Sequence, residues 1–125
     1  MSHAEQPWLL PLLREIQPRP GMYLGHENAR LLEQFLLGYR IARVELGFSE
    51  FGLGEPDHLQ GFTEWLRGRH GIRGSTVPWY ALIEQVDPTD RNLQTFFEEF
   101  VTYLSSQNID FSAVKPVLPK AMRLE

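Results

Sequence analysis

The stretch "NARLLEQFLLGYRIARVELG" (residues 28–47) shows the clearest helical pattern in this 125-residue chain. Its apolar side chains recur every three or four positions, the spacing of one face of an α-helix. They are Leu31, Leu32, Phe35, Leu36, Tyr39, Ala42, Val44 and Leu46. Asn28 is a suitable N-cap and Gly47 a suitable left-handed stop. Because the stripe is wide, we predict that this helix lies at the centre of the core. Gly38, a costly residue inside a helix, predicts close packing against another helix.

Four further segments repeat this period, and each has a recognisable start. Asp57 and Asp87 are suitable capping residues, and Pro78 and Pro88 suit a first helical turn. Pro11 falls inside the first segment, so that helix should be short or kinked. No segment alternates like a strand, and we predict an all-α fold, a compact bundle of about five helices. The four segments cover residues 7–16, 57–66, 78–86 and 87–106.

The connections between these helices are rich in glycine and proline. Residues 47–56 form one such loop, and residues 67–76, "RGRHGIRGST", predict a mobile basic loop. A chain of this length is most simply one domain. We assign residues 1–106 to a single helical domain and residues 107–125 to a C-terminal tail with two prolines, extended or only briefly helical.

The composition narrows the class of protein. The net charge is −4, from 16 acidic and 12 basic residues, which argues against a general nucleic-acid binder and suits a basic protein partner. No apolar run is long enough for a membrane span, and no basic segment precedes the apolar patch near the N-terminus. The chain has no cysteine, which excludes disulfides and thiolate metal sites and fits a reducing compartment. We therefore expect a cytoplasmic protein that binds neither nucleic acid nor a membrane.

No arrangement of residues predicts catalysis, a metal or a cofactor. Glu98 and Glu99 are adjacent, so on a helix their side chains point about 100° apart. Asp87 and Asp90 lie where helix capping already explains them. The serines lack a G-x-S-x-G elbow, and no two histidines have the spacing of paired metal ligands. The histidines are His3, His26, His58 and His70.

The stretch "PRPGMYLGHEN" (residues 18–28) predicts a turn that also docks a partner. Its prolines end the preceding helix, its glycines permit unusual backbone angles, and Arg19 and Tyr23 can bond to neighbouring helices. The string "RPGMYLG" resembles a loop of DNA gyrase B and related topoisomerase ATPases. The Asn-Asp pair expected near Glu33, the D-x-G-x-G loop and the strands of that ATPase are all missing here. We therefore interpret the match as shared turn geometry, not as an ATPase.

The order of motifs is similar to a family of small, mostly uncharacterised bacterial helical proteins. The resemblance covers residues 16–104 and implies an immunity protein, a cytoplasmic antidote that binds and neutralises a co-produced toxin. A basic toxin domain would then be the partner. The residues that carry the likeness are Ile16, the "RPGMYLG" turn of 19–25, Leu32, "FLLGY" of 35–39, Phe62, Trp65, Leu66, Trp79, Leu82, Ile83, Phe96, Phe97 and Tyr103.

Loops that present aromatic residues beside glycine suit protein binding, because aromatic side chains dominate interface hot spots. Three alternatives remain: a helical scaffold or regulatory subunit, a small enzyme that uses the 18–28 turn, and nucleic-acid binding through residues 67–73. The candidate partner-binding or turn-fixing residues are Arg19, Tyr23, His26, Glu27, Phe48, Phe51, Asp87, Asp90 and Glu98.

Overall fold

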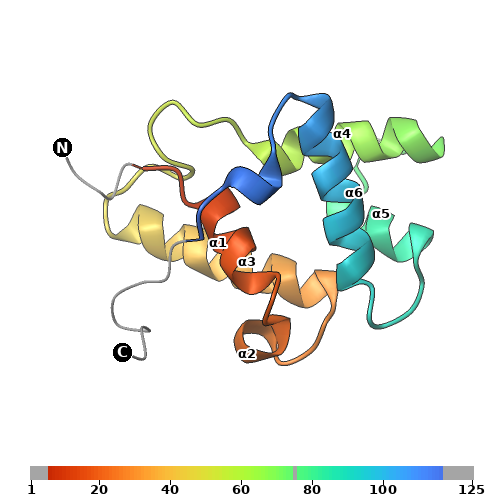
Figure 1. The fold of residues 1–125 in the computed structure, drawn as a ribbon, viewed down its shortest axis with the longest axis horizontal. Helices are drawn as coiled ribbons and strands as arrows, with labels where there is room; N and C mark the ends of the chain where they lie inside the picture. The colour runs from red at the N-terminus through yellow and green to blue at the C-terminus, as the bar shows by residue number, and fades with distance from the viewer. Residues whose placement is uncertain (1–5, 75, 117–125) are drawn as a thin grey trace.

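The computed structural model describes residues 6–74 and 76–116, and within these ranges six α-helices form a bundle without strands (Figure 1). This confirms the predicted all-α fold. None of these described helices is long and apolar enough to cross a membrane. The elements are α1 (Leu9–Ile16), α2 (Pro20–Leu24), α3 (Ala29–Glu45), α4 (His58–His70), α5 (Trp79–Val86), α6 (Leu93–Ser106) and a 3-10 turn, η2 (Phe111–Ala113).

The core is built around α6, which contacts α3, α4, α5 and η2. Phe96 and Phe100 of α6 meet Phe62 of α4, with ring centroids 5.2–5.6 Å apart, and all three side chains are fully buried. Burial of each aromatic side chain stabilises the fold by roughly 1.5–3 kcal/mol. The sequence placed the centre of the core on residues 28–47, but α6 occupies it.

Helix α1 is short, as the position of Pro11 in the sequence predicted. The proline removes no backbone hydrogen bond from this helix. Pro11 is the third helical residue, and the first intrahelical bond runs from Leu12 N to Trp8 O at 3.0 Å. The first four N–H groups of any helix lack an intrahelical acceptor, so a proline in this turn leaves the ladder intact.

The stretch 18–28 is not only a turn, because it contains the single-turn helix α2. Pro20 is its first residue, where the missing N–H costs nothing. Gly25 ends it with φ +77°, a left-handed conformation that glycine adopts without strain. The sixth helix was missed because five residues are too few to show a helical period.

Helix α3 begins as predicted, but its last turn does not pack in the core, because Val44 and Leu46 are exposed. The Asn28 side chain accepts from the backbone N–H groups of Arg30 and Leu31 at 2.9 and 3.3 Å, which is the expected N-cap. The prediction for Gly38 was wrong. A Cβ at this exposed glycine would have no atom within 4 Å, so none of the described helices packs closely against it.

Two other boundaries differ from the prediction. Helix α4 continues to His70, so Arg69 and His70 lie on a helix and not in a mobile basic loop; both pair with Glu99 of α6, at 3.0 and 3.3 Å. Helix α6 begins at Leu93, because residues 87–92 form a turn in which Asp87 accepts from the backbone and hydroxyl of Thr89.

The chain beyond Ser106 stays against the bundle as far as Val114. Phe111 is buried at 3% exposure, with its ring 6.2 Å from that of Phe100. Arg14 of α1 donates to the Val114 carbonyl at 3.1 Å and lies 5.5 Å from the Phe111 ring centroid. Residues 117–125 of the predicted tail lie outside the described residues.

Candidate functional site

Arg19 and Tyr23 attach α2 to α1 through one acceptor, Glu15. The Arg19 guanidinium bonds to Glu15 Oε1 at 2.6 Å, and the Tyr23 hydroxyl donates to the same oxygen at 3.3 Å. Glu15 is only 6% exposed, and a buried carboxylate needs a partner of opposite charge. Arg19 supplies that charge, and the Tyr23 hydroxyl adds a second hydrogen bond. Arg19 and Tyr23 therefore link α2 to the end of α1.

His26, Glu27 and Asp90 come together where the α2–α3 turn meets the α5–α6 turn. Glu27 pairs with Arg91 at 2.8 Å, and His26 lies 3.6 Å from Asp90. A hollow of about 480 Å³ lies beside this contact, and Glu27 and Arg91 both line it. Because these opposite charges already pair with each other, the hollow has little charge left for a ligand.

A buried amide that the sequence did not single out, Asn92, joins the same two turns. Asn92 is 1% exposed; its Oδ1 accepts from the Ala29 backbone at 2.9 Å and its Nδ2 donates to the Asp87 carbonyl at 3.3 Å. The Asp87 carboxylate accepts from the Thr95 and Thr89 hydroxyls, and these bonds lower the pKa of Asp87. Asp87 thus holds the turn between α5 and α6.

The loop aromatics Phe48 and Phe51 surround Arg43 and Trp8. The Arg43 guanidinium donates to the Ser49 carbonyl at 3.0 and 3.1 Å and lies 5.7 Å from the Phe48 ring centroid. Phe51 stacks on Trp8 with centroids 6.4 Å apart. Glu98 is separate from these groups and accepts from Gln94 one turn earlier on α6 at 3.1 Å. Phe48 and Phe51 therefore shape the loop.

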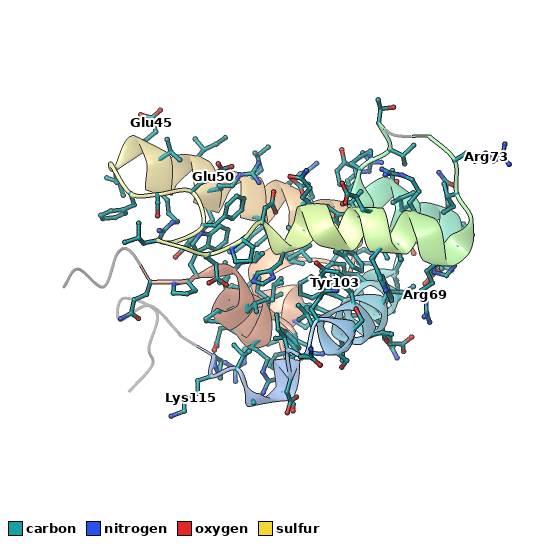
Figure 2. The ribbon with its side chains drawn as sticks, turned by 90° about the horizontal axis from the view of Figure 1, so that it is seen from above. Glu45, Glu50, Arg69, Arg73, Tyr103 and Lys115 are labelled. Carbon is teal, nitrogen blue, oxygen red and sulfur yellow. The ribbon has the colours of Figure 1, made fainter. Side chains whose placement is uncertain are left out.

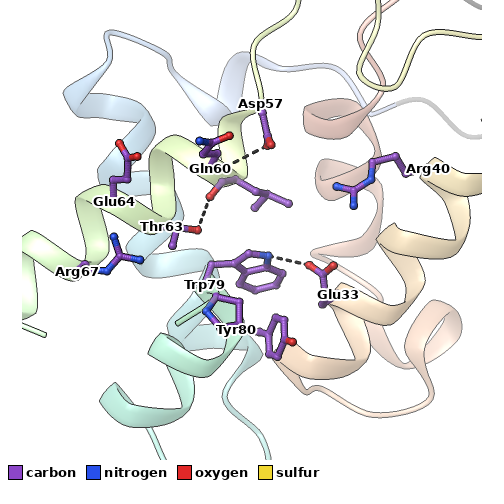
Figure 3. A pocket seen from close by; sticks show the side chains of 11 residues that line it. Glu33, Arg40, Asp57, Gln60, Thr63, Glu64, Arg67, Trp79 and Tyr80 are labelled. Atoms are coloured by element: carbon purple, nitrogen blue, oxygen red, sulfur yellow. Dashed lines mark hydrogen bonds between the residues drawn. The ribbon is translucent and has the colours of Figure 1, made fainter. Parts of the chain in front are cut away.

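A pocket lined by three carboxylates lies where α3, α4 and α5 meet, and we call it the acidic groove. It has a volume of about 340 Å³, and none of the nine predicted residues lines it. Figure 3 shows the Trp79 indole at its centre, between Glu33 of α3 and the side chains of α4. Its lining residues are Glu33, Arg40, Asp57, Leu59, Gln60, Thr63, Glu64, Arg67, Pro78, Trp79 and Tyr80.

Each wall of the acidic groove has a local cause. Asp57 accepts from the Gln60 backbone at 3.2 Å as the predicted cap of α4, and so lies at the upper edge. The indole of Trp79, 5% exposed at the start of α5, packs 4.8 Å from the Phe96 ring and donates its N–H to Glu33 Oε2 at 2.8 Å. The core thus holds the indole that orients Glu33.

The lining of the groove carries three carboxylates and two guanidinium groups, and one of these, Arg40, pairs with a carboxylate outside the lining, so the lining is net negative. Arg40 pairs with Glu50 at 3.2 Å, and Arg67 donates to the Val77 carbonyl at 3.3 Å. Burial raises the pKa of Glu33, and the nearby charge of Asp57 adds to the rise, against the indole bond and Arg40. Glu64 is exposed and forms no ion pair within the described part of the chain.

The lining of the groove therefore has more carboxylates than guanidinium groups, beside Tyr80 and the buried edge of Trp79, and a net negative lining suits a cationic group. The sequence could not reveal it, since Glu33 and Trp79 are far apart along the chain and meet only through helix packing. Among the residues described, no three histidine or acidic side chains are close enough together to hold a metal ion. Comparison with family models, curated proteins and solved structures found no match to this chain.

Proposed function

We propose that the protein is a non-enzymatic binding protein of the immunity type, which holds and neutralises a basic toxin domain in the cytoplasm. The observation that carries this proposal is the acidic groove, where Glu33, Asp57 and Glu64 surround an aromatic wall. A guanidinium or ammonium group of the partner enters it and bonds to carboxylates that have few partners in the free protein. Charge-assisted bonds of this kind are worth roughly 1.5–3 kcal/mol each.

Burial of Glu33 supports the proposal. The raised pKa of Glu33 means that its negative charge is held at a cost in the free protein. A cationic side chain of the partner beside Glu33 removes part of that cost, so the Glu33 carboxylate is more stable in the complex than in the free protein. The net charge of −4 also steers a basic partner toward the protein before contact.

The resemblance to small bacterial immunity-like proteins supports the choice of a toxin as the partner. An immunity protein acts by recognition and occlusion, so it needs a rigid complementary surface and no reactive group. The groove meets this need because its walls are three packed helices, and its Trp79 is fixed on one side by Phe96 and on the other by Glu33. A rigid site loses less conformational entropy on binding.

The test is capture of a partner from native cells in which the neighbouring open reading frame is expressed. We expect a stoichiometric complex with a basic protein that is toxic when produced alone. A clean protein with no partner would overturn the proposal. A stoichiometric partner without toxicity would favour the scaffold or regulatory-subunit alternative instead.

A matched pair of variants then tests the groove. The double change Glu33→Gln and Glu64→Gln removes two groove charges, and we expect at least about tenfold weaker binding and a weaker dependence on salt. The control Glu98→Gln makes the same chemical change on the exposed face of α6, and its affinity should stay within about twofold. Equal affinities for both variants would place the partner elsewhere.

A further inference from the structure

The second half of α3 carries an apolar stripe that nothing in the described chain covers. Leu37, Ile41 and Val44 are 41%, 53% and 54% exposed, and their spacing places them on one side of the helix. They share one surface depression with Arg40 and Glu45, whose edge reaches Glu50. Figure 2 shows Glu45 at one end of the molecule and Arg73 at the other. Contiguous exposed apolar side chains of this kind mark an interaction surface.

Gly38 beside this stripe is unexplained by the fold of the single chain. A glycine inside a helix costs about 1 kcal/mol relative to alanine. A Cβ at this position would meet no atom within 4 Å, so an alanine would fit the monomer without a clash. What the glycine does provide is a shallow place next to Leu37 and Ile41, where a second helix can approach the backbone closely.

We propose that a second copy of this chain covers the stripe, with the two α3 helices side by side and parallel about a two-fold axis. The stripe is self-complementary, as a two-fold interface requires. Ile41 meets its own copy, and Leu37 and Val44 extend the contact by one turn on either side.

The charges beside the stripe select the parallel arrangement. At about 100° per residue, Arg40 lies on one side of the stripe and Glu45 on the other. In a parallel two-fold pair, opposite sides of the two helices face each other, so Arg40 of each copy faces Glu45 of the other. In an antiparallel pair like charges would face each other, which is unfavourable. Arg40 reaches Glu50 of its own chain through Nε, and its side chain keeps 30% of its surface exposed.

The stripe is short, so the dimer is weak. Two helical turns bury less than the roughly 1,200 Å² of a standard interface, which belongs to transient association. We expect a dissociation constant between about 1 µM and about 1 mM. This interface is separate from the proposed partner site, except that Arg40 borders both.

Sedimentation of the purified protein alone, over that concentration range, tests the dimer without any partner. The wild type should pass from monomer to dimer, and Ile41→Asp should weaken association at least about tenfold. Leu53→Asp, which changes an exposed leucine of the 47–56 loop outside the stripe, should behave like the wild type. A wild type that stays monomeric throughout, or equal effects of the two variants, would overturn the inference.

Charge exchange and Gly38 give two further readouts. Arg40→Glu and Glu45→Arg should each weaken the dimer several-fold, and the double exchange should restore it; failure of the double exchange would exclude the parallel arrangement. Gly38→Gln should stabilise the monomer against urea, because glutamine is the better helix former, yet weaken the dimer by filling the contact. If Gly38→Gln leaves the dissociation constant of the dimer unchanged, the two helices do not approach each other closely at Gly38.

Discussion

Replacement of Asn92 by alanine should destabilise the protein more than any other single change of a polar residue in the two joined turns. Asn92 is 1% exposed and makes two bonds, one from the Ala29 N–H at 2.9 Å and one to the Asp87 carbonyl at 3.3 Å. The Asn92→Ala change removes both partners and leaves the Ala29 N–H and the Asp87 carbonyl without their acceptor and donor.

The structure sets the magnitude. A net hydrogen bond contributes about 0.5–1.5 kcal/mol, and a buried donor left unsatisfied costs about 1–3 kcal/mol. The bond from Ala29 is short and buried, whereas the one to Asp87 is long, so we expect a loss of about 2–4 kcal/mol. Asn28→Ala removes the cap of α3 and an exposed bond to the Asp90 carbonyl; because both bonds lie at a more exposed position, it should cost only about 1 kcal/mol.

Urea unfolding of the two variants beside the wild type measures the difference. The midpoint should fall much further for Asn92→Ala than for Asn28→Ala, with an unchanged denaturant slope, since neither change alters the surface that unfolding exposes. A loss for Asn92→Ala below about 1 kcal/mol, or no larger than that for Asn28→Ala, would refute the view that Asn92 joins the two turns.

Three other changes have defined outcomes. Gly61→Ala places a methyl group against the Tyr103 hydroxyl, and urea unfolding should show a loss of about 1–3 kcal/mol that Tyr103→Phe partly restores. Burial raises the pKa of Glu33 above its value in the unfolded chain, so the folded protein loses stability as the pH rises from the unfolded pKa through the folded one. At pH 7 the Glu33→Gln variant should therefore be more stable than the wild type. This difference in stability should disappear below about pH 4.5. Hydrogen bonds lower the pKa of Asp87, so its contribution is complete above its unfolded pKa and is lost as the pH falls through the folded one. Thr95→Val, which removes the first of those bonds, should therefore cost stability at pH 7 and little at pH 2, as thermal unfolding at the two values would show.

The local signals of the sequence were sufficient for the helices and for several of their ends. Asn28 and Asp57 could be identified as the caps of α3 and α4 because each is a short polar residue directly before an apolar period, where its side chain accepts from the free N–H groups of the first turn. Asp87 was misread as the start of a helix because an Asx turn uses the same residue types as an N-cap. The true start of α6 lies beyond Asn92, whose amide serves a different helix.

The candidate site depends on contacts between distant segments, which is why the sequence did not reveal it. Glu33 of α3 and Trp79 of α5 are 46 residues apart in the sequence, and only their meeting makes a groove. Similarly, the apolar period of α3 gave no sign that its last turn is exposed. Val44 and Leu46 belong to the same predicted stripe as Leu32 and Leu36, yet the first pair is exposed and the second is buried.

The bond between Ala29 and Asn92 has a consequence for hydrogen exchange. Amides in the first turn of a helix usually exchange quickly, because no carbonyl of the helix protects them. The Ala29 amide is instead held by a side chain 63 residues away in the sequence, so it can exchange only when the α5–α6 turn separates from α3. Its exchange rate would report the opening of that contact, while neighbouring first-turn amides would report only fraying of α3.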